Sequence, residues 1–144
     1  MVDARWTDEI RERKRRYTVS ATWSKSLSEI EKAAIAATCQ GFIDTVLKPR
    51  FLSQIRPTEF NYPVDILAKW HGTRYRFLQR YRSGFPENRG EEFDAPFTRF
   101  DWIGPDRFDV YWHRHTGTWY CLYRGLSLTK ALKAIETDGH LHPL

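Results

Sequence analysis

The sequence has too little cysteine for a fold held together by disulfides or by a structural zinc ion. Its 144 residues include only two cysteines, Cys39 and Cys121, and neither belongs to a CxxC pair. Disulfide-rich scaffolds and zinc sites both need more cysteines at closer spacing. We therefore expect both thiols to be reduced and buried.

Long hydrophobic runs are also missing. No stretch of about 18 apolar residues occurs, so no membrane-spanning helix is predicted. Residues 1–16, MVDARWTDEIRERKRR, carry charges where a secretory signal peptide needs an apolar core. The sequence therefore predicts a cytoplasmic protein without a membrane partner.

The common catalytic motifs are absent as well. The sequence contains no Walker A loop, no GxGxxG, no GxSxG and no HExxH. The acidic residues between positions 87 and 101 lack the D/E-x-K arrangement of metal-dependent nucleases, because Asp101 is followed by Trp102-Ile103. We expect a non-enzymatic protein that needs no cofactor.

The composition is that of a single globular domain with a basic extension. Hydrophobic residues make up 41% of the chain and aromatic residues 15%, which is enough for one sizeable core. Residues 1–25 are basic, and the only apolar anchors of their helical segment are Ile10 and Tyr17. We expect residues 1–25 to be an arm, marginally helical or disordered, and residues 26–144 to form the domain.

A helix is predicted at the start of the domain. Ser26 with Glu29, and Ser28 with Glu31, both fit the S-x-x-E capping box. Apolar side chains recur at helical spacing from there to Leu47, and Pro49 is expected to end the helix. Residues 48–63 contain three prolines and are expected to form an irregular connection.

From Val64 the hydrophobic period changes to two, which predicts β-strands. Five strands separated by short turns are expected, and a loop is expected at residues 83–95. A final helix is predicted over residues 128–138, with Ser127 as its N-cap. The strands are predicted at residues 64–71, 74–82, 96–103, 107–113 and 118–124. Because connections this short join antiparallel neighbours, the predicted fold is α+β: a five-stranded antiparallel meander with both helices on one face.

The same order of elements resembles a known bacterial family. The likeness rests on FDVYWHRHTGTWYCLY, residues 108–123, and on the short helix that ends in Glu136-Thr137-Asp138-Gly139. On these features the chain from about residue 30 onward is similar to the family called domain of unknown function 3024. The resemblance implies a bacterial origin but no activity, so it transfers no site residues.

Basic residues are the strongest functional signal. Alternation places four arginines of the second predicted strand on one face, about 7 Å apart, which is similar to the phosphate repeat of a nucleic-acid strand. The arm adds further cations, and nearby exposed aromatic rings could stack on unpaired bases. The candidate nucleic-acid-binding residues are Arg11, Arg13, Lys14, Arg15, Arg16, Arg74, Arg76, Arg80 and Arg82.

Two other interpretations of the arginine face stay open. Arginines on the outer side of an antiparallel strand commonly serve only as a solvated face. The acidic residues at positions 87–94 could be a solvated loop, or they could pair with the arginines inside the protein and weaken any nucleic-acid surface.

Aromatic side chains suggest a different function. The last three predicted strands carry more aromatic residues than one face of a small sheet can hide, which favours a binding surface or dimer interface on the last two. The candidate interface residues are Tyr111, Tyr120 and Leu122. The alternative function is therefore a protein-interaction module or a homodimer.

Histidines give a weaker alternative. Four imidazoles near turns and at the C-terminus could form a transition-metal site if they converged: His113, His115, His140 and His142. HxH pairs at a turn and at a terminus are each common by chance, so we expect these side chains to be solvated or packed.

Overall fold

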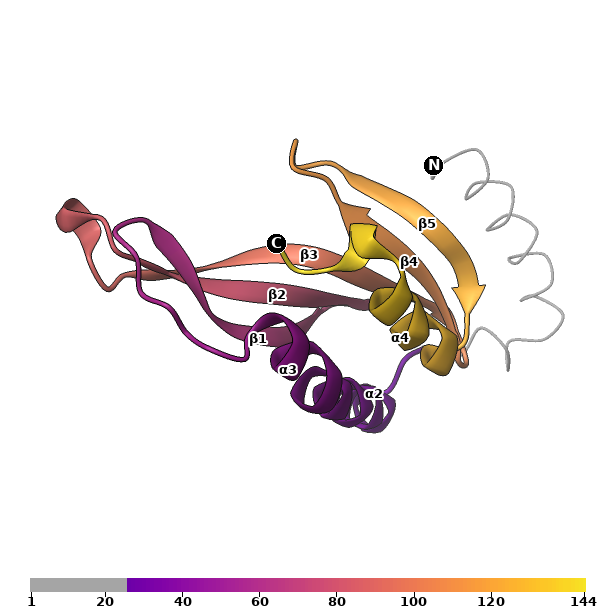
Figure 1. Cartoon of the computed structure of the whole chain (residues 1–144). Helices are drawn as coiled ribbons and strands as arrows, with labels where there is room; N and C mark the ends of the chain where they lie inside the picture. The colour runs from indigo at the N-terminus through magenta and orange to yellow at the C-terminus, as the bar shows by residue number, and fades with distance from the viewer. Residues whose placement is uncertain (1–25) are drawn as a thin grey trace, which may run out of the picture.

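The computed structural model describes residues 26–144, which form a five-stranded antiparallel sheet in the order β1-β2-β3-β4-β5. Figure 1 shows the sheet as a strongly curved layer. The strands are β1 (Asn61–His71), β2 (Arg74–Ser83), β3 (Glu92–Gly104), β4 (Arg107–His113) and β5 (Trp119–Leu126). Each strand pairs with its neighbour in the chain, which confirms the predicted α+β meander.

The two main helices cover one face of this sheet (Figure 1). They are α2 (Glu29–Phe42) near the start of the domain and α4 (Leu128–Thr137) near its end. Short helical turns complete the chain: η2 (Ile43–Leu47), α3 (Lys48–Phe51), η3 (Pro86–Asn88) and η4 (Gly139–Leu141). The largest fully buried side chains lie between helices and sheet: Phe77, Phe100, Phe108, Ile43, Leu47, Ile66 and Ile135. No helix among residues 26–144 is long and apolar enough to cross a membrane.

The start of α2 follows the predicted capping box. The Glu31 backbone N–H donates to Ser28 Oγ at 3.1 Å, and the Ser28 backbone N–H donates to Glu31 Oε1 at 3.1 Å. Both bonds satisfy N–H groups that would otherwise lack partners at the helix start. Ser28, rather than Ser26, is therefore the N-cap.

Pro49 does not end the helix near Leu47, as the sequence suggested. A π-helical turn at Ile43–Leu47 leads directly into α3, in which Pro49 is an N-terminal residue. In a regular α-helix a proline ring clashes with the carbonyl four residues earlier. The wider π turn relieves that clash, so the helix continues to Phe51.

Two strands begin earlier than predicted. β1 begins at Asn61 and includes Pro63, which is tolerated because β1 is an edge strand and its register shifts between Pro63 and Asp65. β3 begins at Glu92, so the second part of the predicted loop at residues 83–95 is strand. This extension brings acidic residues of β3 beside the arginines of β2.

The two cysteines are free and differ in burial. Cys39 is fully buried in the core, and burial raises the pKa of its thiol to about 12. Cys121 on β5 is only half-buried. The prediction that both thiols are buried therefore holds fully for Cys39 alone.

Candidate nucleic-acid interface

The sheet has a second face, on the side away from α2 and α4, which we call the outer face. Alternation along β2 places Tyr75 and Phe77 in the core and the even-numbered residues from Arg74 to Arg82 on the outer face. All four predicted arginines therefore share one face. What they contact there decides which of them can bind a phosphate.

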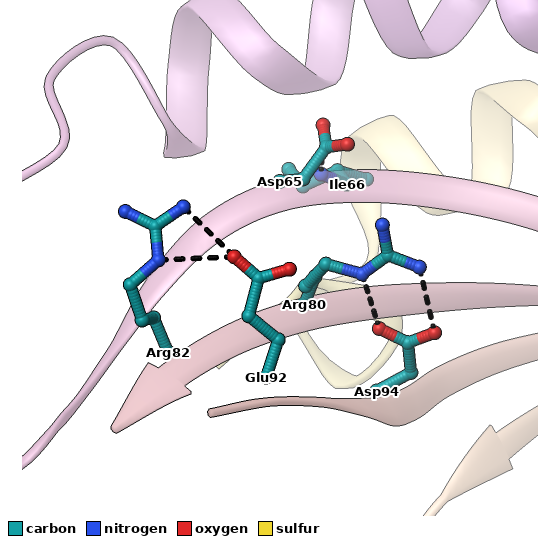
Figure 2. Close-up of polar contacts among 6 residues, drawn as sticks. All are labelled: Asp65, Ile66, Arg80, Arg82, Glu92 and Asp94. Carbon is teal, nitrogen blue, oxygen red and sulfur yellow. Dashed lines mark hydrogen bonds and ion pairs between the residues drawn. The ribbon is translucent and has the colours of Figure 1, made fainter. Parts of the chain in front are cut away.

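Three of the four arginines already pair with carboxylates that lie directly opposite them on β3. Figure 2 shows Arg80, whose Nε and Nη2 atoms bind the Asp94 carboxylate at 2.8 and 3.1 Å. It also shows Arg82, which uses the same two atoms to bind Glu92 Oε2 at 2.9 and 2.8 Å. The Nε atom of Arg74 lies 3.8 Å from Asp101 Oδ2.

These ion pairs shift the pKa values of the groups that form them. Hydrogen bonds from Arg80 hold the pKa of Asp94 below its ordinary value, although partial burial opposes them. The same contact raises the pKa of Arg80, and the hydrogen bond to Glu92 raises that of Arg82. Because each charge has an internal partner, these arginines are weaker phosphate ligands than their number suggests.

Arg76 is different from its three neighbours. Among residues 26–144 no carboxylate pairs with it, and its Nε atom is buried without a hydrogen-bond partner. It lies directly opposite Lys69 on β1 and directly opposite Arg99 on β3. These three side chains, Lys69, Arg76 and Arg99, form a line of positive charge across three strands, which we call the cationic row.

Arg99 is held in place by an acid and by two aromatic rings. Its side chain is only 7% exposed, and its Nε and Nη2 atoms bind the Asp101 carboxylate at 2.7 and 3.0 Å. Its guanidinium carbon lies 4.1 Å from the ring centre of Tyr111 and 4.8 Å from that of Trp119. Such contacts fix the guanidinium through cation–π attraction.

Burial governs the ionisation of two groups around the row. It raises the pKa of Asp101 above its ordinary value, against the opposing attraction of Arg99 and Arg74. Burial and, after it, the positive charge of Arg76 lower the pKa of His113. The ring centre of His113 lies 4.7 Å from that of Trp119, on the same face as the cationic row.

The structure does not bring together the three candidate interface residues. Tyr111 lies opposite Cys121, and Tyr120 lies opposite Trp112. Because directly paired residues share a face, Tyr111 belongs to the outer face and Tyr120 to the helix-bearing face. Leu122 packs against the core. The expectation that these residues form one exposed face is wrong, because the register of the β4–β5 hairpin separates Tyr111 from Tyr120.

The four candidate metal-binding histidines are also dispersed. His113 contacts Trp119, whereas His140 contacts Trp112 on the helix-bearing face, and His142 lies 4.9 Å from the ring centre of Phe51. His115 lies exposed in the β4–β5 turn. Within residues 26–144, no group of three or more histidine, cysteine, aspartate or glutamate side chains is placed to hold a metal ion.

Arg11, Arg13, Lys14, Arg15 and Arg16 lie outside the described residues.

Sequence reasoning missed two members of the cationic row. Lys69 and Arg99 each stand alone among other residue types on their strands, so no run of basic residues marks them. The alternation of Arg99 with Asp101 was a usable signal, because residues two apart on a strand share a face. Only the strand register shows that both cations flank Arg76.

Comparisons with known proteins give one match. A family model described as "Domain of unknown function (DUF3024)" matches residues 27–142. Neither the comparison with curated proteins nor that with solved structures found a match.

Proposed function

The chain belongs to the DUF3024 family, and because that description assigns no activity, we propose from the geometry of the outer face that the protein binds nucleic acid without catalysing a reaction. The proposal places it in the bacterial cytoplasm. It assigns the first contact with phosphate to the cationic row, rather than to the whole arginine face of β2.

The observation that carries the proposal is the position of Arg76. Like charges directly opposite one another destabilise a sheet, yet Arg76 lies between Lys69 and Arg99 and, within the described residues, has no carboxylate partner. Neighbouring strands are about 4.8 Å apart, so two adjacent cations of the row can contact one phosphate group. A bound phosphate would supply the missing partner of Arg76 and offset the repulsion within the row.

The surroundings of the row favour a single strand over a duplex. Tyr111 and Trp119 lie next to Arg99 on the same face and are half-buried, so each keeps some surface for contact. Aromatic side chains beside cations on a sheet are a common way to stack unpaired bases while the cations hold the backbone. A duplex hides its bases and would gain only the phosphate contacts.

The remaining basic residues have secondary parts in this proposal. Arg74, Arg80 and Arg82 add to the positive potential of the face but, like Arg99 within the row, must loosen an internal ion pair to bind a phosphate directly. The basic arm, residues 1–25, would add sequence-independent contacts with the backbone.

The test is fluorescence anisotropy with labelled single- and double-stranded DNA and RNA across a salt series. The variant is Lys69→Glu with Arg76→Glu. The matched control is Arg82→Glu with Glu92→Arg, which exchanges the two charges of one ion pair and keeps both the pair and the net charge. Loss of two phosphate contacts should lower the salt slope for a single strand by about 1.4 and weaken binding at least about tenfold at low salt.

The outcomes separate the proposal from its alternatives. Binding that survives the row variant, or that falls equally in the charge-exchanged control, contradicts a role for the cationic row. If the wild-type protein binds no nucleic acid at low salt, the proposed function fails and a protein partner or self-association becomes the function to test. Light scattering coupled to size-exclusion chromatography would then measure the oligomeric state directly.

A further inference from the structure

A cavity of about 610 Å³ lies away from the cationic row, between the end of α4 with the η4 turn and strands β3, β4 and β5. Its volume is in the range of small-molecule sites. Pro96, Phe97 and Trp112 give it apolar and aromatic walls. The polar residues that complete its lining are Tyr123, Thr137, Asp138, His140 and His142. His113 also borders the cavity, but its ring lies on the outer face against Trp119.

Two of these polar side chains donate their hydrogen bonds to the Asp138 carboxylate. The Tyr123 hydroxyl donates to Asp138 Oδ2 at 2.7 Å, and the His140 Nδ1–H donates to Asp138 Oδ1 at 3.0 Å. The His140 backbone N–H also donates to Oδ1 at 3.0 Å. The Asp138 carboxylate therefore accepts three hydrogen bonds. Because His140 donates through Nδ1, its Nε2 atom carries a lone pair when the ring is neutral.

Two more polar side chains donate hydrogen bonds to backbone carbonyl oxygens. The Thr137 hydroxyl donates to the carbonyl of Lys133 at 2.9 Å. His142 Nε2 lies 3.2 Å from the carbonyl oxygen of Glu136, and because a carbonyl only accepts, Nε2 must carry the proton. His142 Nδ1 therefore carries a lone pair. Four lining side chains thus offer acceptors and no free donor.

The aromatic lining of the cavity adds a hydrogen-bond donor to these acceptors. Trp112 has an indole N–H, so one donor lies among the acceptors of the lining. The ring of Trp112 packs edge to face against that of His140, with 4.8 Å between ring centres, which places an aromatic surface beside the His140 acceptor. A complementary ligand is flat, presents N–H donors along one edge and carries ring nitrogens that accept.

We propose that this cavity binds a nucleobase with an exocyclic amino group, such as adenine. The amino group and its neighbours on the base edge would donate to His140 Nε2 and His142 Nδ1, and the ring would lie against the aromatic wall. A simple ammonium or guanidinium group has no acceptor for the indole N–H of Trp112, and a carboxylate would face lone pairs. The base is either that of a free nucleoside or one base of a bound strand.

Calorimetric titration with adenosine tests the proposal on the full chain. With few polar contacts to the base, the cavity should bind adenosine with a Kd of about 0.1–1 mM. Purine riboside, which lacks the amino group, should bind about tenfold more weakly because one buried acceptor then loses its donor.

Two variants locate the binding in the cavity. His140→Phe keeps a ring of similar size but removes the acceptor, and its matched control is His115→Phe, because His115 lies in the exposed β4–β5 turn. Gly139→Leu narrows the cavity from its lining, and a side chain added at Gly139 meets no atom within 4 Å at its Cβ, so the fold should tolerate it. Both cavity variants should weaken adenosine binding about tenfold or more, whereas the control should match the wild type.

Three results would overturn the proposal: no heat of binding with adenosine, equal affinity for purine riboside, or unchanged affinity in both cavity variants. Competition identifies the source of the base. If adenosine displaces a labelled oligoadenylate, the pocket takes a base of the strand; if adenosine binds without displacing it, the pocket takes a free nucleoside. Because adenosine has no phosphate, its binding to the Lys69→Glu, Arg76→Glu protein tests the pocket even if the cationic row binds no nucleic acid.

Discussion

Arg76 and Arg99 lie directly opposite one another on β2 and β3, although both side chains are positively charged. Asp101 binds Arg99 through two hydrogen bonds, while the Nε atom of Arg76 is buried without a partner. The local arrangement therefore lowers the stability of the sheet at a position where an anion could restore it.

Replacing Arg76 should separate stability from binding. Arg76→Glu puts an acid opposite Lys69 and Arg99, so the free energy of unfolding should rise by about 0.2–1 kcal/mol, as for other cross-strand pairs of opposite charge. Affinity for single-stranded nucleic acid should fall in the same variant. Urea denaturation measures the first effect and anisotropy the second. A destabilised Arg76→Glu protein would show that Arg76 is not under charge repulsion, and Arg76→Gln, which only removes the charge, should fall between the two.

Replacing Arg99 should lower the free energy of unfolding substantially. Its side chain is 7% exposed and that of Asp101 is 17% exposed, so Arg99→Met leaves a largely buried carboxylate whose remaining partner among residues 26–144 is the more distant Arg74. We expect a loss of about 3 kcal/mol in unfolding free energy. Arg99→Met combined with Asp101→Asn should recover much of this loss, because the unpaired charge is gone. An equal loss in the double variant would show that packing on Tyr111 and Trp119, rather than the ion pair, holds Arg99.

The Arg80–Asp94 pair predicts a pH dependence. The pKa of Asp94 is held below its ordinary value of 3.8, so its contribution to stability is complete above that pH. The contribution is lost as the pH falls through the lowered pKa of the folded state, because protonation then breaks the pair. Asp94→Asn should cost about 0.5–1 kcal/mol at pH 7, since the pair is partly exposed.

That cost should shrink as the pH is lowered below 3.8. Chemical denaturation of the wild type and Asp94→Asn between pH 7 and pH 3 gives the comparison. A difference that stays constant over this range would mean that the charge of Asp94 contributes nothing.

Gly84 should be intolerant of any side chain. A Cβ at this position would overlap the carbonyl oxygen of Thr58, and the Gly84 N–H donates to the carbonyl of Phe60 at 2.7 Å. Gly84→Ala should therefore destabilise the protein by about 1–3 kcal/mol.

Gly41 in α2 provides the matched control for Gly84. A Cβ there meets nothing within 4 Å, so Gly41→Ala should stabilise the protein by about 0.5–1 kcal/mol through helix propensity. Thermal unfolding of both variants measures the contrast. A stable Gly84→Ala protein would mean that residues 58–60 shift without cost.

The sequence predicted the elements better than their contacts. Alternation along residues 74–82 correctly placed the arginines on one face and Tyr75 and Phe77 in the core. The glycine, proline and asparagine that precede Glu92 and Asp94 predict a loop there. Their strand is stabilised by pairs with Arg82 and Arg80 that only the fold creates. Long-range pairs of this kind leave no local pattern.

Register explains the largest error at the site. Whether Tyr111 and Tyr120 share a face depends on the number of residues in the turn between their strands, and a shift of one residue would exchange the faces. Here His113 pairs with Trp119, which puts the two tyrosines on opposite sides. Composition predicts that a turn exists but does not set its register.

The meander order has a consequence for how the chain folds. Every strand pairs with the next one along the chain, so the whole sheet can assemble through successive hairpins that close short loops. The helices do not share this advantage, since α2 and α4 contact each other from nearly opposite ends of the domain, and Arg50 Nη1 donates to the carbonyl of Glu136 at 2.9 Å. We expect the docking of these two helices to close the longest loop and to set the folding rate.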